Sequence, residues 1–511
     1  MNPNAIKKIV IVGGGTAGWM TAAALAKKFS ATNIVLTLVE SEAIGTVGVG
    51  ESTIPHIRHF NQFLGIDESV FIAETKATFK LGIAFKNWGV LGSDYIHPFG
   101  PLGHDINGVE FHHYWLRMQR EGYAFTSSSY ALDSYSLAAS AARAGKFQHP
   151  SVDRKNLLST YSYAFHFDAA LYAKYLRNYS EIIGVVRQEG MVVETKLNSD
   201  NGFIHSVVLD SGLVVEGDLF IDCSGFKGLL IDRVLHATFE DWSHWLACDK
   251  AVAVPCESSA KMLAPFTQAT AHKAGWQWRI PLQHRTGNGH VYASDYMSED
   301  EATAILLNNL DGAPLGEPRC FTFKAGQRKQ NWKKNCVAIG LSGGFLEPLE
   351  STSIYLIQVG IQKLLEFFPD KNFFKSNTAE FNRQVDAEYT RIRDFIIMHY
   401  KETRRDDSQF WLRCKNMTVP DALQQRQELF GQSGYVDHEQ YGVYQSVCIG
   451  QGLIPRNYDF KINKFSSNDI EIYLRKIRTD INTAVDAMPS AKNYIESIVA
   501  VSAAVVQAGR Q

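Results

Sequence analysis

Three glycines near the start of the chain match the pattern GxGxxG, directly after an apolar run at residues 6–12. In this pattern the first glycine permits a tight turn, and the second lets the backbone approach a pyrophosphate. The third lets a helix pack closely on a strand, and the amides at the start of that helix would face the phosphates. We therefore predict a dinucleotide site. Its expected phosphate-binding residues are Gly13, Gly15, Thr16, Ala17 and Gly18.

An acidic residue follows at the distance expected for a ribose contact. Residues 16–29 have a helical pattern, and residues 33–40 indicate a second strand that ends at Glu40. A carboxylate at this point accepts a hydrogen bond from a ribose hydroxyl. The order strand, helix, strand predicts a parallel sheet at the start of the fold.

The fingerprint does not by itself distinguish FAD from NAD. A second glycine-rich turn contains Gly50 within residues 48–55, and a strand–glycine–helix passage at 335–352 contains Gly340. A site whose parts recur so far apart along the chain suits an elongated, bound FAD. Because no second complete GxGxxG is present for NAD(P)H, we expect a separate flavin reductase to supply FADH2.

Lys80 and two glutamates are the side chains best suited to chemistry. Lys80 lies in the aromatic segment Phe-Lys-Leu-Gly-Ile-Ala-Phe-Lys-Asn-Trp at 79–88. A lysine is most often a solvated surface charge, but a desolvated one can act as a nucleophile. Glu347 and Glu350 flank Pro-Leu at what the pattern predicts to be a helix start. Acids are ordinary in a first helical turn, so their types alone leave structural and catalytic roles open.

A bulky segment, Gly-Trp-Gln-Trp-Arg-Ile-Pro, occupies residues 275–281. Alone it indicates core packing. Together and in this order, the fingerprint, the Phe-Lys segment, the WxWxIP motif and the Glu-Pro-Leu-Glu-Ser-Thr run at 347–352 resemble the flavin-dependent halogenases of the tryptophan halogenase family. The resemblance runs from near residue 6 to about residue 360. It implies an α/β fold with an FAD-binding Rossmann-like domain of the glutathione-reductase or flavin-monooxygenase type, an additional β-sheet and a mainly helical C-terminal substrate region.

The resemblance also implies roles for single residues. Lys80 matches the catalytic lysine of the family, and Glu350 matches the acid or base that precedes Ser-Thr. Thr352 and Ser353 lie where family members bind halide, and a helix N-terminus is a reasonable anion site. The family usually has glycine where this chain has Ser353. We therefore leave the choice between chloride and bromide open and expect the serine to alter halide preference.

His97 and Phe99 fall where family members stack a flat aromatic substrate. Without the family, an aromatic loop would explain them equally well. Trp276 and Trp278 match the residues that separate the substrate from the flavin, so that substrate is not oxygenated directly. In the implied reaction FADH2, oxygen and halide give hypohalous acid. This acid crosses an internal tunnel to Lys80, and Glu350 assists electrophilic substitution on the ring.

The substrate is less well defined than the reaction. Residues 441–450 contain no recognisable set of groups for the amino and carboxylate groups of tryptophan. Tryptophan, indole and larger indole derivatives therefore all stay open. The alternative functions are an FAD-dependent aromatic monooxygenase, which would need neither Lys80 nor the tryptophan wall, and a non-catalytic FAD-binding protein.

Composition sets broader limits. The chain has 511 residues, 45% hydrophobic and 20% charged, which is ordinary for a globular protein. A net charge of −2 argues against binding to nucleic acid or an anionic membrane. The seven cysteines form no CxxC pair, and the histidines form no HExxH motif. We therefore expect a cytoplasmic protein with reduced thiols and no metal, as a monomer or homodimer.

The pattern along the chain predicts two domains. Residues 1–375 would form a discontinuous FAD-binding domain with an irregular, pocket-building insertion at about 90–155. Residues 376–511 would form a mainly helical region that caps the substrate, with breaks near 405, 433 and 466. Residues 198–202 indicate a hairpin turn. The apolar stretch 498–508 is too short to span a bilayer, so we expect a buried C-terminal helix.

Overall fold

The computed structural model describes residues 3–43, 50–122, 131–258, 263–437 and 444–508, with side chains as far as residue 501. The chain forms two compact units, each assembled from three separate segments. Unit 1 comprises Met1–Lys76, Phe167–Leu246 and Thr322–Ile392, and unit 2 comprises Ala77–His166, Ala247–Phe321 and Arg393–Gln511. The predicted boundary after residue 375 falls at the start of helix α9 (Lys375–Lys401). The division into FAD-binding and capping domains stays a prediction.

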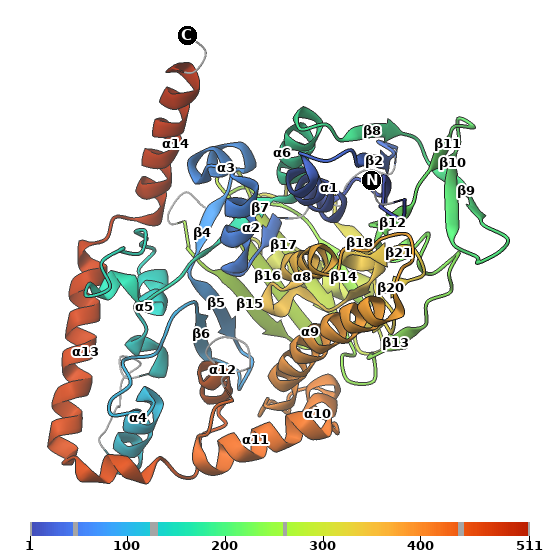
Figure 1. The fold of residues 1–511 in the computed structure, drawn as a ribbon. Coiled ribbons are helices and arrows are strands. Elements are labelled where there is room, and N and C mark those ends of the chain that lie inside the picture. Colours follow the sequence, from blue (N-terminus) through green and yellow to red (C-terminus); the bar gives the residue numbers. More distant parts are fainter. Residues whose placement is uncertain (1–2, 44–49, 123–130, 259–262, 438–443, 509–511) are drawn as a thin grey trace. The chain divides into compact units, whose positions relative to one another are not determined.

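Unit 1 is organised around a six-stranded sheet. Its strands are β1 (Lys8–Val12), β2 (Val35–Glu40), β8 (Val186–Glu189), β12 (Leu219–Asp222), β20 (Trp332–Lys333) and β21 (Cys336–Ala338), in the order β20-β21-β12-β1-β2-β8 (Figure 1). Its neighbouring strands pair in parallel, except β20 with β21, which are antiparallel. Helix α1 (Thr16–Phe29) connects β1 to β2, so the predicted parallel βαβ opening is confirmed.

An antiparallel ribbon follows in unit 1, formed by β9 (Val192–Leu197), β10 (Ile204–Leu209) and β11 (Val214–Glu216). The predicted hairpin turn at 198–202 joins β9 to β10 and is confirmed. A hydrophobic cluster connects this ribbon to the six-stranded sheet. Its fully buried members include Val10, Val207, Leu209, Phe220 and Leu230.

Unit 1 also contains further helices, short strands and 3-10 turns. The helices are α2 (His56–Leu64), α3 (Glu68–Thr75), α6 (Ala169–Ile182) and α8 (Ser353–Glu366). The short strands are β3 (Gly50–Ser52), β13 (Phe239–Asp241), β19 (Gly326–Arg328) and β22 (Gly344–Phe345). Short 3-10 turns occur at η4 (Gly225–Lys227), η5 (Gly340–Ser342) and η6 (Pro348–Glu350).

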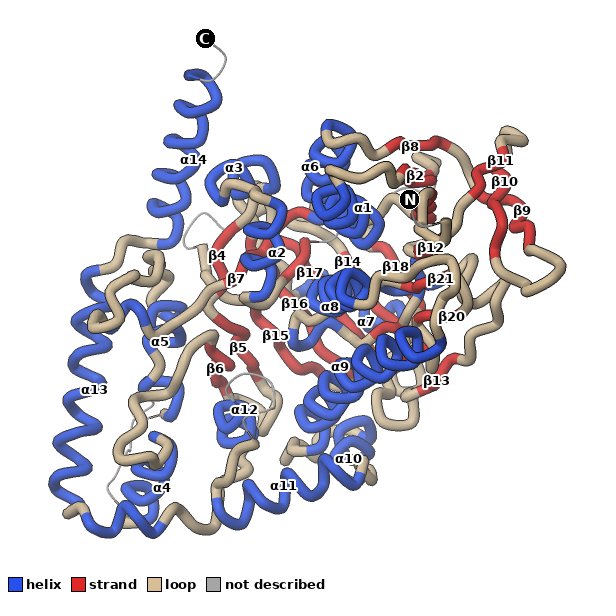
Figure 2. Tube along the Cα trace, viewed as in Figure 1, coloured by secondary structure: helices blue, strands red, loops and turns tan. Residues whose placement is uncertain are grey.

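Unit 2 is organised around a seven-stranded sheet. Its strands are β5 (Gly82–Lys86), β6 (Asp94–Pro98), β14 (Lys250–Ala253), β15 (Thr267–His272), β16 (Gly275–Pro281), β17 (Thr286–Tyr292) and β18 (Arg319–Thr322), in the order β18-β14-β17-β16-β15-β5-β6 (Figure 2). β15 pairs in parallel with β5, whereas β15–β16, β16–β17, β14–β17 and β5–β6 are antiparallel. Strand β4 (Thr78–Lys80) pairs antiparallel with β7 (Ala164–Asp168).

Helices complete unit 2. They are α4 (Phe111–Arg120), α5 (Leu137–Arg143), α7 (Glu299–Asn308), α10 (Gln409–Asn416), α11 (Asp421–Ser433), α12 (Tyr444–Gln451), α13 (Ser467–Ala487) and α14 (Ala491–Ala508), with 3-10 turns η2 (Leu132–Tyr135), η3 (Leu157–Ser159) and η7 (Phe460–Lys464). The predicted helical C-terminal region is confirmed, and the breaks predicted near 405 and 433 fall between helices. The break predicted near 466 is the N-cap of α13.

Two expectations need correction. Residues 90–155 are not irregular throughout, because β6, α4 and α5 form there; apolar residues recur at helical spacing in both helices. The C-terminal helix is not buried along its described length. Ile495 is buried, but Val501 is 61% exposed. Among the described residues, no helix is long and apolar enough to cross a membrane.

Candidate functional site

The three glycines of the GxGxxG turn in unit 1 differ in the space beside their α-carbons among the described residues. Gly13 has φ +113°, and a Cβ there would lie 2.3 Å from the carbonyl oxygen of Cys223. A Cβ at Gly18 would lie 1.8 Å from the carbonyl oxygen of Gly13, so helix and turn are in direct contact. At Gly15, the N-cap of α1, a Cβ would meet no described atom within 4 Å. The open space therefore lies where a pyrophosphate would approach the amides of α1.

Glu40 lies over this turn. A Cβ at Gly14 would lie 1.5 Å from the Glu40 carboxylate. Arg187 Nε donates to Glu40 Oε1 at 2.6 Å, and Trp19 Nε1 donates to Oε2 at 3.3 Å. These partners fix the carboxylate at the end of β2. Each oxygen has a second lone pair, so the group can still accept a ribose hydroxyl.

Gly340 and Gly50 belong to two further segments of unit 1. Gly340 has φ +80°, and a Cβ there would lie 2.8 Å from the Cβ of Ala17, so η5 packs against the first turn of α1. Gly50 is buried in β3, while Gly48 and Val49 of the same predicted turn lie outside the described residues. The glycine positions and the helix N-terminus fit a dinucleotide such as FAD.

Sequence reasoning missed Glu51, next to Gly50. Burial raises the pKa of its carboxyl to about 7. A carboxyl that titrates near neutral pH is a common feature of functional sites, although structural burial can produce the same shift. The only sequence signal was its place in the glycine-rich run at 48–55.

The acidic run at 347–352 forms a turn before α8, not its first helical turn. Pro348–Glu350 is the 3-10 turn η6, and Ser351 has φ +59°, so the chain turns sharply before α8 begins at Ser353. This corrects the predicted helix start. Glu347 and Glu350 are both buried, and Ser351 Oγ donates to Ser52 Oγ at 3.0 Å. The turn is thereby attached to β3, the strand that carries Glu51.

Thr352 and Ser353 are the N-cap and first residue of α8. Thr352 is buried, and its carbonyl accepts the amide of Leu356 at 2.9 Å. The first amides of a helix have no partner within that helix, and the helix dipole places positive charge there. The two residues predicted to bind halide therefore lie at a position suited to an anion.

Lys80 is fully buried in unit 2. Its Nζ lies 5.1 Å from the centroid of the Phe99 ring. The β5–β6 pairing places Phe99 there, since the Phe99 amide donates to the Leu81 carbonyl at 2.8 Å. His97 is also buried, and its ring lies 5.6 Å, nearly edge-on, from that of Phe395 on α9. Lys80 is thus not the solvated surface charge that its residue type alone favours.

Trp276 and Trp278 lie on one face of β16, with ring centroids 6.1 Å apart. Both are buried. Trp278 covers Gly289 of β17, where a Cβ would lie 2.0 Å from the indole. Trp276 lies 6.3 Å from Trp88, in the aromatic core of unit 2. The pair therefore contributes to packing, and its role as a partition stays a prediction.

The predicted residues divide between the units. The glycine turn, Glu40, Glu350 and the halide residues lie in unit 1. Lys80, His97, Phe99 and the two tryptophans lie in unit 2. Sequence reasoning missed His166, which hydrogen-bonds Thr78 and Thr267 near Lys80. His166 lies in strand β7 (Ala164–Asp168), every residue of which is buried, and no motif marked it in the sequence.

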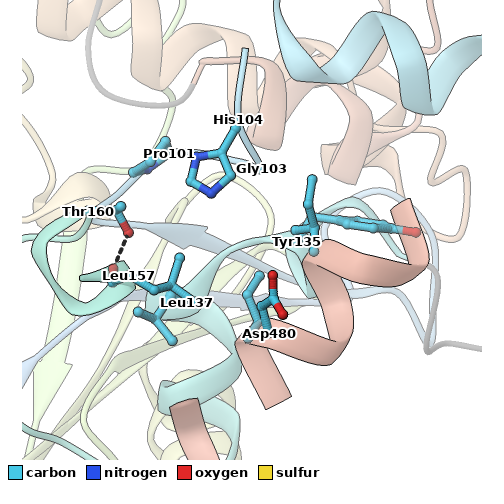
Figure 3. A pocket seen from close by; sticks show the side chains of 10 residues that line it. Pro101, Gly103, His104, Tyr135, Leu137, Leu157, Thr160 and Asp480 are labelled. Carbon is cyan, nitrogen blue, oxygen red and sulfur yellow. Dashed lines mark hydrogen bonds between the residues drawn. The ribbon is translucent and has the colours of Figure 1, made fainter. Parts of the chain in front are cut away.

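Unit 2 contains a small pocket that opens to solvent. Its lining residues come from the loop after β6, from η2, α5 and η3, and from α13 (Figure 3). Figure 3 shows His104 from the loop after β6, Leu137 from α5 and Asp480 from α13 around this pocket. The loop continues directly from Phe99. Pro101, Gly103, His104, Tyr135 and Leu137 of the segment 90–155 therefore line this pocket, while the expected substrate pocket stays a prediction.

One group in the described part of the chain has metal-ligand character: Glu110, His112 and His113. His112 Nε2 lies 2.7 Å from the Gly434 carbonyl and therefore carries a hydrogen, which leaves Nδ1 facing Glu110 at 3.6 Å. His113 Nδ1 accepts the amide of Asp459, so Nε2 carries the hydrogen in the neutral ring. This hydrogen bond removes the lone pair that His113 would use as a ligand. The expectation of no metal stays a prediction.

Comparison with known proteins places the fold and these motifs in one family. The profile described as Tryptophan halogenase matches residues 8–467. The chain is 36% identical over 523 residues to the tryptophan 6-halogenase SttH of Streptomyces toxytricini, covering 98% of this chain and 99% of the relative. It is 37% identical over 443 residues to the tryptophan 7-halogenase RebH of Lentzea aerocolonigenes, covering 83% and 82%.

The structural comparison agrees. BrvH, a flavin-dependent halogenase from Brevundimonas sp. BAL3, matches with a TM-score of 0.92 and 44% identity, covering 97% of this chain and 99% of that chain. Xcc4156, a flavin-dependent halogenase from Xanthomonas campestris, matches with the same TM-score and identity, covering 97% and 98%. The chain belongs to the tryptophan halogenase family. It is an FADH2-dependent halogenase that uses halide and oxygen.

Proposed function

We propose that this enzyme halogenates an indole-type aromatic by electrophilic substitution, with Lys80 and Glu350 as its catalytic residues. Bound FADH2, supplied by a separate flavin reductase, would provide the activated oxygen that oxidises halide to hypohalous acid. The protein's contribution is to bind the cofactor and halide, separate them from the substrate, and place charge at the reacting ring.

Residues of unit 1 bind the reactants in this proposal. The amides after Gly15 face the pyrophosphate, and Glu40 accepts a ribose hydroxyl. Thr352 and Ser353 hold the halide at the start of α8. Glu350 stabilises the cationic ring intermediate and takes up the displaced ring proton.

Residues of unit 2 direct the halogen. The Lys80 amine donates a hydrogen bond to hypohalous acid and makes its halogen more electrophilic. His97 and Phe99 hold the flat substrate, whereas Trp276 and Trp278 separate it from the flavin. The observation that carries the proposal is the buried amine of Lys80 at 5.1 Å from the Phe99 ring. Lysine side chains are rarely fully buried in proteins, so this position is unusual for the residue type.

The substrate class is an indole. Relatives named as tryptophan halogenases support the indole ring. Of the segment 441–450, where we sought groups for the polar end of tryptophan, residues 441–443 lie outside the described residues. We therefore propose tryptophan, indole or a larger indole derivative, which a substrate panel separates.

The test is a panel of indoles incubated with the protein, FAD, a flavin reductase, NADH and either chloride or bromide. Mass spectrometry should detect a product heavier by one halogen for at least one indole, and only when halide is present. A hydroxylated product formed without halide would instead identify an aromatic monooxygenase. Peroxide formation with no product from any indole would contradict the proposed substrate class.

We further propose a cytoplasmic location. None of the seven cysteines forms a disulfide, and six of them are buried, which suits a reducing compartment. We also propose that the protein is a monomer or homodimer and does not bind nucleic acid. Light scattering at several protein concentrations would distinguish the two oligomeric states.

A further inference from the structure

His166 is the centre of a buried chain of hydrogen bonds near Lys80. Its Nδ1 lies 3.0 Å from Thr78 Oγ1, and its Nε2 lies 2.9 Å from Thr267 Oγ1. Thr78 Oγ1 also contacts the carbonyl oxygen of Pro281 at 2.7 Å. The side chains of Thr78, His166 and Thr267 are at most 4% exposed. They join β4, β7 and β15, and they reach the last residue of β16.

The direction of each hydrogen bond follows from the donors available. The Thr78 hydroxyl has one hydrogen and gives it to the Pro281 carbonyl, so its oxygen accepts from His166 Nδ1. In a neutral ring Nε2 then has a lone pair, which accepts from the Thr267 hydroxyl. Burial, followed by the positive charge of Lys80, holds the pKa of His166 well below its ordinary value. The ring is therefore neutral, with its hydrogen on Nδ1.

Strand pairing connects this series of hydrogen bonds to the Lys80 amine. Thr78 pairs directly with His166, and Lys80 pairs with Ala164 two residues further along. Because side chains two residues apart share a face of a strand, Thr78 and Lys80 point to the same side of β4.

We propose that His166 is a positioning residue that fixes the strand carrying Lys80 to the end of the strand carrying the two tryptophans. The proposal rests on the catalytic role assigned to Lys80. His166 acts through Thr78, because the hydrogen bond from Nδ1 holds the hydroxyl oxygen in place while its hydrogen points to the Pro281 carbonyl. A displaced catalytic group loses rate steeply, and an error of about 1 Å can cost about a hundredfold.

The primary test replaces His166 and measures halogenated product per FADH2 oxidised, which we term coupling. His166→Phe retains a ring but removes both hydrogen bonds. We expect it to lower coupling at saturating substrate at least tenfold, with FADH2 oxidation within twofold of wild type. The hypohalous acid that is no longer used should appear in a bulk chemical trap.

Two replacements separate the halves of the chain. His166→Asn places an amide near the position of Nδ1 and can still donate to Thr78. His166→Gln reaches toward Nε2 and Thr267 instead. We expect His166→Asn to recover at least half of the wild-type coupling and His166→Gln to resemble His166→Phe. Should His166→Phe fail to fold, Thr78→Val should reproduce its loss, and Thr78→Ser should not.

His290 provides the matched control. It is also fully buried in unit 2, and its Nδ1 contacts the Ala302 carbonyl at 3.1 Å. His290→Phe should lower thermal stability without changing coupling. Wild-type coupling in His166→Phe, equal loss in His290→Phe, or no recovery in His166→Asn would overturn the positioning role.

Reference reactions separate this proposal from the one on which it depends. Wild-type enzyme must form halogenated product, and Lys80→Met must not. Product from Lys80→Met would contradict the catalytic role of Lys80, and the positioning role with it. Loss of product in Lys80→Met together with full coupling in His166→Phe would contradict His166 alone.

Discussion

The hydroxyl of Thr78 donates a hydrogen bond to the carbonyl oxygen of Pro281, 203 residues further along the chain. Thr78 lies two residues before Lys80, and Pro281 ends the WxWxIP motif. Two motifs that look independent in the sequence are thus physically joined within unit 2.

Removal of the Lys80 amine should separate halogenation from flavin oxidation. Lys80→Met keeps most of the buried volume but cannot donate to hypohalous acid. We expect product to fall more than about a hundredfold, a loss within the range for a catalytic group, while FADH2 oxidation continues. Product by mass spectrometry and oxygen uptake are measured in parallel. Lys86→Met, at the half-buried end of β5, should retain activity; full activity in Lys80→Met would refute the assignment.

Glu350→Gln should slow the reaction of the ring. The substitution preserves shape but removes the negative charge and the base, so kcat should fall about 10²- to 10⁴-fold. Glu347→Gln, a buried acid of the same turn, is the control and should reduce kcat less than tenfold. Single-turnover kinetics with FADH2-loaded enzyme would measure both. Equal losses in the two variants would indicate a general effect on the turn.

Ser353→Gly should shift halide preference toward bromide. The glycine removes a side chain from the first residue of α8, which both widens the site and removes a possible donor to halide. Bromide is larger and less strongly hydrated than chloride, so both changes favour it. Competition between the two halides, read from the isotopic pattern of the product, gives the ratio directly. An unchanged ratio would exclude a role for this serine.

Gly15→Ala should weaken FAD binding, whereas Gly18→Ala should destabilise the fold. At Gly15 the added methyl group meets no described atom but occupies the predicted pyrophosphate space, so FAD affinity should fall at least tenfold with little change in apoprotein Tm. At Gly18 it would lie 1.8 Å from a backbone oxygen, so we expect destabilisation by more than about 2 kcal/mol. Calorimetry of FAD binding and thermal unfolding measure the two effects. Unchanged FAD affinity in Gly15→Ala would contradict the assigned phosphate position.

Glu51 should make the stability of the apoprotein depend on pH. Its carboxyl has a pKa of about 7 in the fold against 4.5 ordinarily, so folding favours the protonated form. The contribution of this carboxyl to the free energy of unfolding is complete below about pH 4.5 and is lost as the pH rises through 7. Its upper limit is about 3 kcal/mol. Between pH 5 and 8, wild-type Tm should therefore fall relative to that of Glu51→Gln. Glu317→Gln, at an exposed position, should follow wild type; a parallel pH profile in Glu51→Gln would exclude the effect.

Local patterns predicted the parts of the fold whose causes are local. The helix expected at 16–29 is α1 (Thr16–Phe29), because the glycine turn and the apolar strand before it fix its start. The helix expected near Glu350 begins later, since Ser351 adopts φ +59° and interrupts the backbone. No pattern within a few residues signals that left-handed turn. The residue type of Lys80 likewise gave no indication that its side chain is buried.

Local sequence patterns could not predict contacts between segments that are distant in the sequence. His166 hydrogen-bonds Thr78 across 88 residues and Thr267 across 101. Such pairings are set by strand order in the folded protein, and strand preferences depend strongly on that context. The family resemblance identified Lys80 but not the residues that hold its strand.

The bridge from Thr78 to Pro281 also orders events in time. During synthesis the ribosome must add two hundred further amino acids after Thr78 before its acceptor exists. The nascent β4 strand therefore cannot acquire its final neighbours early, and enclosure of the amine belongs to the later stages of biogenesis.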